Sequence, residues 1–341
     1  MIVHYTEAQN AANAYRKDYL HGVQALIAKK LSECSEDRMN RAPFVLGNPD
    51  AARQELFDML GWPLTEAVKQ PLSVERQLLK EENGVCLWRM KFEIFKDFHF
   101  YGLFFESVGQ KLPFVMVQHG YGGTSEQCSG LFEVGTSIYN DMVQRVVAKK
   151  VHAFAPQLLM WFPERYDIEH ERIVLDAKLK QVGGSIAALE IYCLRCCLSY
   201  FESLDCVDAG KMGMVGLSYG GFFTLYTMAS DVRLKAGLSA CYFGNRTKFI
   251  FPDWTWESAA QRFLDSEVAL LCYPRQLWLA LGKKDEAATA DSGAEEYARL
   301  KRELALAGVD DSWGRFTVFD GAHEFCPDDT LLDEFVAALK R

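Results

Sequence analysis

Residues 211–224 read KMGMVGLSYGGFFT, and this stretch decides the fold that the sequence predicts. It opens a run without charged residues, from Met212 to Ser230, that reaches the length of a membrane span. Glycines divide the run into a short apolar strand, a sharp turn and the start of a helix, which argues against a transmembrane helix. An uncharged strand followed at once by a helix is typical of the buried parallel sheet of an α/β protein.

The turn in this stretch carries the pattern G-x-S-x-G, formed by Gly216, Ser218 and Gly220. A serine between a buried strand and a helix is held in a strained turn with its hydroxyl above the sheet, and the helix N-terminus favours negative charge nearby. A glycine-rich turn that only connects two core elements would show the same sequence pattern. The strand and helix on either side favour the first interpretation, so Ser218 is the candidate nucleophile.

A nucleophilic serine needs a base, and in this kind of fold the chain order is serine, acid, histidine. Asp285 follows the expected strand QLWLALG, and His323 lies in the loop after the expected strand RFTVFD. We therefore expect His323 to be the general base and Asp285 the acid that orients it. Glu286 is a close competitor for the role of the acid. The sequence contains no H-E-x-x-H motif, and no metal or cofactor is expected.

Acyl transfer also needs hydrogen-bond donors for the oxyanion of the tetrahedral intermediate. The stretch HGYGG at residues 119–123 follows the expected strand PFVMVQ. We assign one backbone amide to Tyr121 and the second to Tyr219, the residue after the nucleophile. The same glycines could instead form a turn without catalytic donors. The side chain of His119 is expected to shape the loop rather than to titrate.

Outward from this centre, short apolar strands alternate with helical stretches. Residues 85–94 and 98–105 have aromatic and apolar side chains with a period of two, which predicts an antiparallel hairpin. The expected fold class is α/β: a mostly parallel sheet with this hairpin at its N-terminal side and helices on both faces. Residues 1–80 are expected to form a helical extension, beginning near Thr6, and residues 81–341 the catalytic domain.

An aromatic-rich insertion at about residues 241–270 falls between the candidate nucleophile and the candidate acid. A lid or a pocket wall could lie there, and Phe243, Trp254 and Trp256 are the residues expected to bind substrate. Large aromatic residues are as often part of the packed core, and the sequence leaves both interpretations open.

The net charge of −9 and the isoelectric point near 5.4 leave no basic stripe for phosphates, so no nucleic-acid partner is expected. No membrane partner is expected either, because the beginning of the chain lacks a basic segment followed by an apolar core. A small-molecule ester substrate and a cytoplasmic location are expected, with the ten cysteines as reduced thiols. Assembly into a homo-oligomer stays open.

With these residues in view, the chain from about Val85 to Arg341 resembles the α/β-hydrolase superfamily, and within it the dienelactone hydrolase and acetyl xylan esterase-like branch. The resemblance rests on HGYGG at 119–123, GLSYGG at 216–221, the stretch ending at Asp285 and GAHEF around His323. It implies hydrolysis of esters through an acyl-enzyme, without a cofactor. Dienelactone hydrolases proper use a cysteine nucleophile, whereas this chain has a serine, which favours ester over lactone hydrolysis.

Two other functions fit the same residues. The stretch GLSYGGF also resembles the nucleophile turn of prolyl-oligopeptidase-type serine peptidases, although this chain has no room for their propeller domain. A noncatalytic ligand-binding protein with the same fold is the second alternative.

Overall fold

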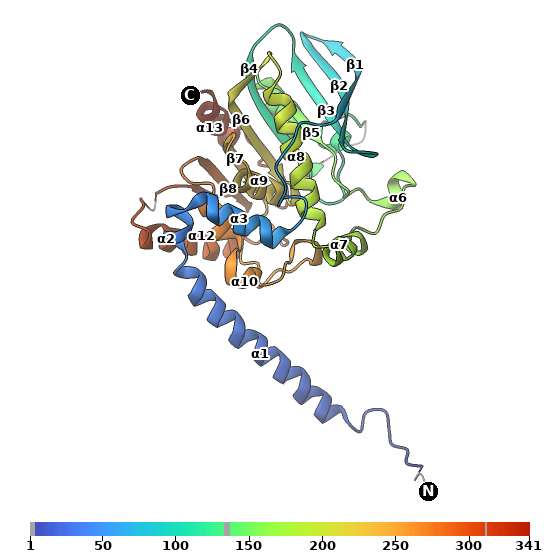
Figure 1. The fold of residues 1–341 in the computed structure, drawn as a ribbon, viewed down its shortest axis with the longest axis vertical. Coiled ribbons are helices and arrows are strands. Elements are labelled where there is room, and N and C mark those ends of the chain that lie inside the picture. Colours follow the sequence, from blue (N-terminus) through green and yellow to red (C-terminus); the bar gives the residue numbers. More distant parts are fainter. Residues whose placement is uncertain (1–3, 133–136, 311) are drawn as a thin grey trace.

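The computed structural model describes residues 4–132, 137–310 and 312–341, and one nine-stranded sheet runs through its centre (Figure 1). The spatial order of the strands is β1-β2-β3-β5-β4-β6-β7-β8-β9. In chain order the strands are β1 (Ser73–Glu82), β2 (Val85–Phe95), β3 (Phe98–Ser107), β4 (Leu112–Gln118), β5 (His152–Pro156), β6 (Val207–Leu217), β7 (Leu234–Ala240), β8 (Gln276–Gly282) and β9 (Arg315–Phe319).

The first three strands are antiparallel, and the six from β4 to β9 are parallel to one another. The predicted hairpin is confirmed as β2 and β3, and β3 joins the parallel part through an antiparallel pairing with β5. Strand β1 was not predicted. Its side chains are mostly exposed and carry five charges among ten residues, so no apolar face marks it, and its pairing with β2 defines it.

Helices cover both faces of the sheet, as the sequence predicts. Two apolar clusters separate the layers: α5 and α13 contribute to one, and α8, α9 and α12 to the other. The helices are α1 (Asn13–Met39), α2 (Ala42–Gly47), α3 (Pro49–Leu60), α4 (Ser125–Cys128), α5 (Met142–Ala148), α6 (Pro163–Tyr166), α7 (Arg172–Gln181), α8 (Ile186–Glu202), α9 (Tyr219–Ser230), α10 (Ala259–Arg262), α11 (Asp265–Leu270), α12 (Ala290–Leu306) and α13 (Thr330–Lys340), with short 3-10 helices at Ser137–Tyr139 and Pro252–Trp254.

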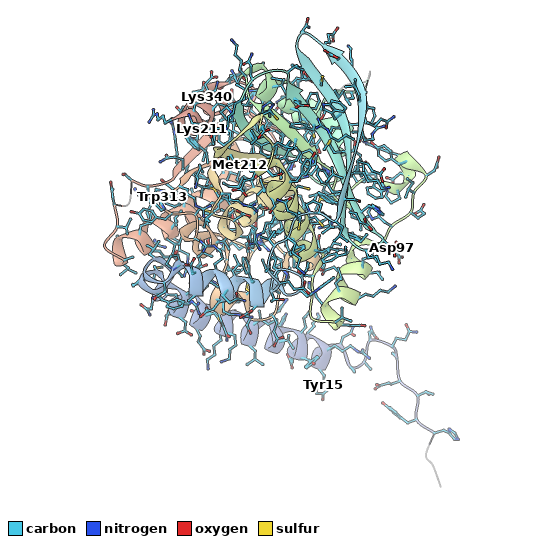
Figure 2. The ribbon with its side chains drawn as sticks, turned by 45° about the horizontal axis from the view of Figure 1, so that its top comes forward. Tyr15, Asp97, Lys211, Met212, Trp313 and Lys340 are labelled. Atoms are coloured by element: carbon cyan, nitrogen blue, oxygen red, sulfur yellow. The ribbon has the colours of Figure 1, made fainter. Side chains whose placement is uncertain are left out.

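Helix α1 extends away from the body of the molecule as an arm, and Tyr15 lies on its outer part (Figures 1 and 2). The helix begins at Asn13, later than the expected start near Thr6. Its inner end is anchored by Arg38, which is buried and forms an ion pair of 2.7 Å with buried Glu267 of α11. Within the described residues, helices that are both long and apolar enough to cross a membrane are absent.

The parallel strands bring the candidate site together. Strands β4, β6, β8 and β9 end at Gln118, Leu217, Gly282 and Phe319, each a few residues before a residue that the sequence predicts to be functional. The carboxyl ends of parallel strands meet at one edge of a sheet, which is where α/β folds bind their ligands. The fold therefore directs four separate loops to a common place.

Candidate active site

Ser218 occupies a strained turn between β6 and α9. Its φ is +61° and its ψ is −120°, a conformation that side chains other than glycine rarely adopt. The turn needs small neighbours: a Cβ atom on Gly216 would lie 2.1 Å from the carbonyl oxygen of Gly220, and one on Gly220 would lie 2.1 Å from that of Gln118. The two glycines of the motif are therefore required by close backbone contacts, and α9 begins directly after the serine.

Asp285 and His323 contact each other across 38 residues of sequence. The Nδ1 atom of His323 lies 2.8 Å from Oδ2 of Asp285. The carboxylate of Asp285 is buried, whereas 32% of the His323 side chain is exposed. Burial raises the pKa of Asp285, but hydrogen bonds from His323 and from the Ala288 amide outweigh burial and hold it below its usual range. An ionised carboxylate here keeps the proton of the imidazole on Nδ1, leaving Nε2 as the base.

Glu286, the competitor for the acid's role, has a different environment. Its side chain is exposed and lines a neighbouring cavity, while Asp285 makes the contact with His323.

Ser218 and His323 line the same cavity, which has a volume of about 260 Å³. The lining also includes Gly120 of the glycine loop, Cys241 directly after β7, and Ala287 and Ala288 in the loop after β8. Among the described residues, the lining is Gly120, Tyr121, Ile138, Ser218, Tyr219, Cys241, Tyr242, Phe249, Phe251, Trp254, Ala287, Ala288 and His323. A hydroxyl at a strained turn and an imidazole oriented by a carboxylate thus open into one small aromatic cavity.

The amides expected to bind an oxyanion lie beside the serine. Tyr219 is the first residue of α9, so its amide has no acceptor within the helix. In the loop after β4, the Gly120 amide donates to the Tyr139 hydroxyl at 3.1 Å and the Gly122 amide donates to the Met160 carbonyl at 2.7 Å. The Tyr121 amide between them has no acceptor among the described residues. Both tyrosines line the cavity, and their rings lie 5.9 Å apart.

His119 is fully buried and fixes the loop that carries these donors. The Leu158 amide donates to its Nε2 at 3.1 Å, so Nδ1 carries the proton and donates to the Gly120 carbonyl at 2.9 Å. Burial lowers the pKa of His119 to about 4, which keeps the ring neutral. The histidine ties the loop after β4 to the loop after β5, in agreement with the expectation that it shapes the loop.

The three aromatic residues expected to bind substrate differ in position. Trp254 lines the cavity, Phe243 lines the neighbouring one, and Trp256 packs in the core with its ring 5.7 Å from that of Tyr226. Sequence reasoning did not single out Cys241, which follows β7 directly and lines the cavity. Its position just after a parallel strand was the signal that could have identified it.

Cys241 gives the site a set of side chains that could hold a metal. Its Sγ, a carboxylate oxygen of Asp285 and a ring nitrogen of His323 all lie within 4.8 Å of one another. The chemistry of these donors fits a metal poorly. A cysteine binds a metal as a thiolate. Burial raises the pKa of the Cys241 thiol, which favours the protonated form. The protonated sulfur donates to the Glu324 carbonyl at 3.3 Å.

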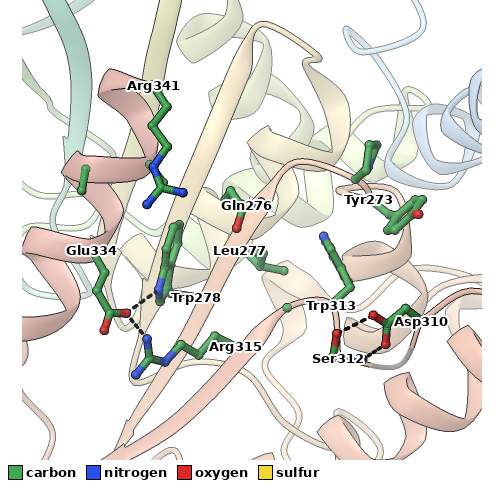
Figure 3. Close-up of a pocket in the computed structure, with 14 residues that line it drawn as sticks. Tyr273, Gln276, Leu277, Trp278, Asp310, Ser312, Trp313, Arg315, Glu334 and Arg341 are labelled. Carbon is green, nitrogen blue, oxygen red and sulfur yellow. Dashed lines mark hydrogen bonds and ion pairs between the residues drawn. The ribbon is translucent and has the colours of Figure 1, made fainter.

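A larger cavity of about 850 Å³ lies at the opposite edge of the sheet, near the start of β8 and β9 (Figure 3). It is lined by residues such as Trp278, Trp313 and Arg341. Several of its polar groups are paired with one another: Glu334 accepts from Trp278 at 3.2 Å and forms an ion pair with Arg315. It contains none of the residues expected to be catalytic, so the smaller cavity at Ser218 is the candidate active site.

Many solved structures are similar to this chain, and three of them illustrate the range. A candidate acetyl xylan esterase from Bacteroides fragilis has a TM-score of 0.64 and 14% identity, with 82% of this chain and 76% of that chain covered. A glucuronoyl esterase from Solibacter usitatus has a TM-score of 0.60 and 14% identity, with 88% and 92% covered. Acetyl xylan esterase 1 from Thermoanaerobacterium sp. JW/SL YS485 has a TM-score of 0.53 and 12% identity, with 90% and 94% covered.

Neither a protein-family model nor a curated protein matches the chain. At such low identity the three structures establish the fold and leave the activity to be argued from the site. The chain has the α/β-hydrolase fold, as the sequence predicts.

Proposed function

We propose that this chain is a serine hydrolase that cleaves carboxylic esters, with acetyl or other short acyl groups, through an acyl-enzyme. The observation that carries the proposal is the hydrogen bond between His323 and Asp285 at the cavity that Ser218 also lines. The three similar structures are named as esterases or candidate esterases, which supports the same reaction class. The same fold hosts many activities, so the side chains at the cavity, rather than the fold, indicate the reaction.

The proposed reaction uses groups of this chain alone. Nε2 of His323 takes the proton of the Ser218 hydroxyl as its oxygen attacks the ester carbonyl carbon. The amides of Tyr121 and Tyr219 and the N-terminus of α9 stabilise the oxyanion. The intermediate collapses, the alcohol leaves with the proton from His323, and an acyl ester on Ser218 remains. Water then attacks this ester with His323 again as base, which releases the acid and restores the serine.

The test is labelling and turnover of purified protein. We expect a fluorophosphonate probe to label Ser218, and Ser218→Ala or His323→Ala to lower the hydrolysis of p-nitrophenyl acetate by about four orders of magnitude. Lys284→Ala, an exposed lysine next to the candidate acid, is the control and should change turnover little. Turnover by Ser218→Ala within tenfold of the parent would exclude the proposal.

The same preparation separates esterase from peptidase activity. An amide with the acyl group of the best ester should be hydrolysed far more slowly, because an amide is intrinsically less reactive than an ester and an esterase is not required to overcome that difference. Faster cleavage of the amide would favour the peptidase.

A further inference from the structure

The cavity at Ser218 is walled by rings and lacks fixed charge. Six of its lining residues are aromatic: Tyr121, Tyr219, Tyr242, Phe249, Phe251 and Trp254. Its described lining contains no Lys, Arg, Asp or Glu. A group that enters this space therefore meets apolar surface on most sides, with Ser218 and His323 at the reacting end.

The hydroxyl groups of two of these tyrosines are already used behind the wall. Tyr219 donates to Asp253 at 2.8 Å, and Tyr242 donates to Asp265 at 2.7 Å. Both carboxylates are buried and neither lines the cavity. The tyrosines therefore present their rings rather than their hydroxyls to a ligand.

A buried ionic network holds the ring wall in place. The ring of Tyr219 stacks on Trp254 with centroids 4.4 Å apart and an angle of 21° between the planes. Asp253, the residue before Trp254, also accepts from Arg172 at 2.6 Å, and Arg172 forms two further bonds to Glu190 at 2.9 and 2.8 Å. All three charged side chains are buried. The wall is thus fixed before a ligand arrives, which reduces the entropy cost of binding.

One cation, Arg246, also lies behind the aromatic wall, but it already forms an ion pair. Arg246 lies 4.8 Å from the Trp254 ring, bonds to the Trp254 carbonyl, and forms an ion pair with Asp265. It does not line the cavity. A carboxylate placed among the rings, away from the amides of Tyr121 and Tyr219, would lose its hydration without gaining a cationic partner from the described lining, which is costly.

We infer that this cavity is a binding site for one uncharged aromatic ring, or an apolar group of similar size, carried by the ester substrate. The inference rests on the proposed function and narrows it. The volume of about 260 Å³ lies just below the range of about 300 to 1,000 Å³ that holds drug-sized ligands, so a single ring fits better than a long chain or a sugar chain. Aromatic walls attract rings in edge and offset geometries.

The first experiment compares esters that differ only in charge. On the acyl side the pair is ethyl phenylacetate and ethyl (4-carboxyphenyl)acetate, and on the alcohol side benzyl acetate and 4-carboxybenzyl acetate, so that each ester carries a single ring. We expect kcat/KM for the neutral ester to exceed that for the charged ester at least tenfold on the side that occupies the cavity. Equal values for both pairs would overturn the inference.

The second experiment compares two tryptophans of the same insertion. Both are buried, but only Trp254 lines the cavity. Trp254→Leu should lower the ratio of kcat/KM for the ring ester to that for ethyl acetate, which carries no ring, about tenfold or more, whereas Trp256→Leu should leave this ratio unchanged. A ratio that stays constant in Trp254→Leu, or falls equally in both variants, would contradict the assignment.

A binding measurement separates failure of this inference from failure of the proposed function. Ser218→Ala should bind neutral phenylacetamide more tightly than 4-(carbamoylmethyl)benzoate, which carries a carboxylate on the ring, as followed by tryptophan fluorescence, and Trp254→Leu should weaken that binding. This result needs no turnover, so it can hold even if Ser218 proves not to be a nucleophile. Equal binding of both compounds, with an active parent enzyme, would contradict the ring site without contradicting the proposed esterase function.

Discussion

The carboxylate of Asp285 is held by His323 on one side and by its own loop on the other. Oδ2 lies 2.8 Å from the His323 ring, while Oδ1 accepts from the amides of Ala287 and Ala288 at 2.9 and 2.8 Å. The loop amides fix the direction of the carboxylate, and the carboxylate in turn fixes the ring. A side chain with the same shape but without negative charge would keep the hydrogen bonds to the loop amides and change the position of the proton on the His323 ring.

Asp285→Asn should therefore lower kcat by about four orders of magnitude while leaving the fold intact, because an amide group can donate to Nδ1 and move the ring proton to Nε2. Glu286→Gln is the matched control and should keep turnover within about threefold, since Glu286 is exposed. Circular dichroism and ester hydrolysis check both variants. A larger loss in Glu286→Gln would reassign the acid.

Gly120 lies against the nucleophile, and its replacement tests the turn. A Cβ atom there would be 2.8 Å from the Leu217 carbonyl oxygen and 3.0 Å from the Cβ of Ser218. Gly120→Ala should displace the serine or the donor loop and lower kcat about a hundredfold, because small misplacements of reacting groups are costly. Gly22→Ala, in the exposed arm where nothing lies within 4 Å, should leave ester hydrolysis unchanged. Equal activity of the two variants would refute the role of Gly120.

Much of this arrangement could be predicted from the sequence, because the parallel strands are short, apolar and bounded by glycine or charge. The turn formed by GLSYGG also has close backbone contacts that only glycine permits, so the sequence pattern itself indicates the geometry of the turn. The roles of Ser218, His323 and Asp285 stay predictions, although Asp285 and His323 are in contact as expected.

The wall of the cavity was harder to predict. Trp254 and Trp256 are two residues apart and equally apolar, yet only the first lines the cavity. The difference is set by the bonds of Asp253 to Arg172 and Tyr219, which come from distant segments. Long-range pairing of this kind has no local periodicity, and the same reason explains why β1 was missed.

The Cys241 thiol should be neither a nucleophile nor a metal ligand. Its pKa is raised by burial, and its sulfur lies 3.3 Å from the Glu324 carbonyl. Incubation with EDTA, or with iodoacetamide at pH 8, should leave ester hydrolysis within about twofold of the untreated protein. Loss of activity with EDTA that Zn²⁺ restores would reveal a metal site formed by Cys241, Asp285 and His323.

The buried carboxyl of Glu296 should make the protein less stable as the pH rises. Burial, with added repulsion from Glu267 and Asp265, raises its pKa from 4.5 to about 7. The folded state then binds a proton that the unfolded state releases, so this group costs stability increasingly between pH 4.5 and about 7. Glu296→Gln removes the cost, keeps an acceptor for the Ser266 amide, and should raise the free energy of unfolding at pH 8 by about 1 to 3 kcal/mol.

Urea unfolding at pH 5 and pH 8 checks this expectation, and the gain from Glu296→Gln should be small at pH 5, where the parent carboxyl is largely protonated in the folded state. Glu295→Gln is the control from the neighbouring position. Glu295 is exposed and pairs with Lys248 at 2.6 Å, so its replacement should change stability by no more than about 0.5 kcal/mol, and in the unfavourable direction. A Glu296→Gln variant that is less stable than the parent at pH 8 would mean that the carboxyl is ionised and paired in the folded protein.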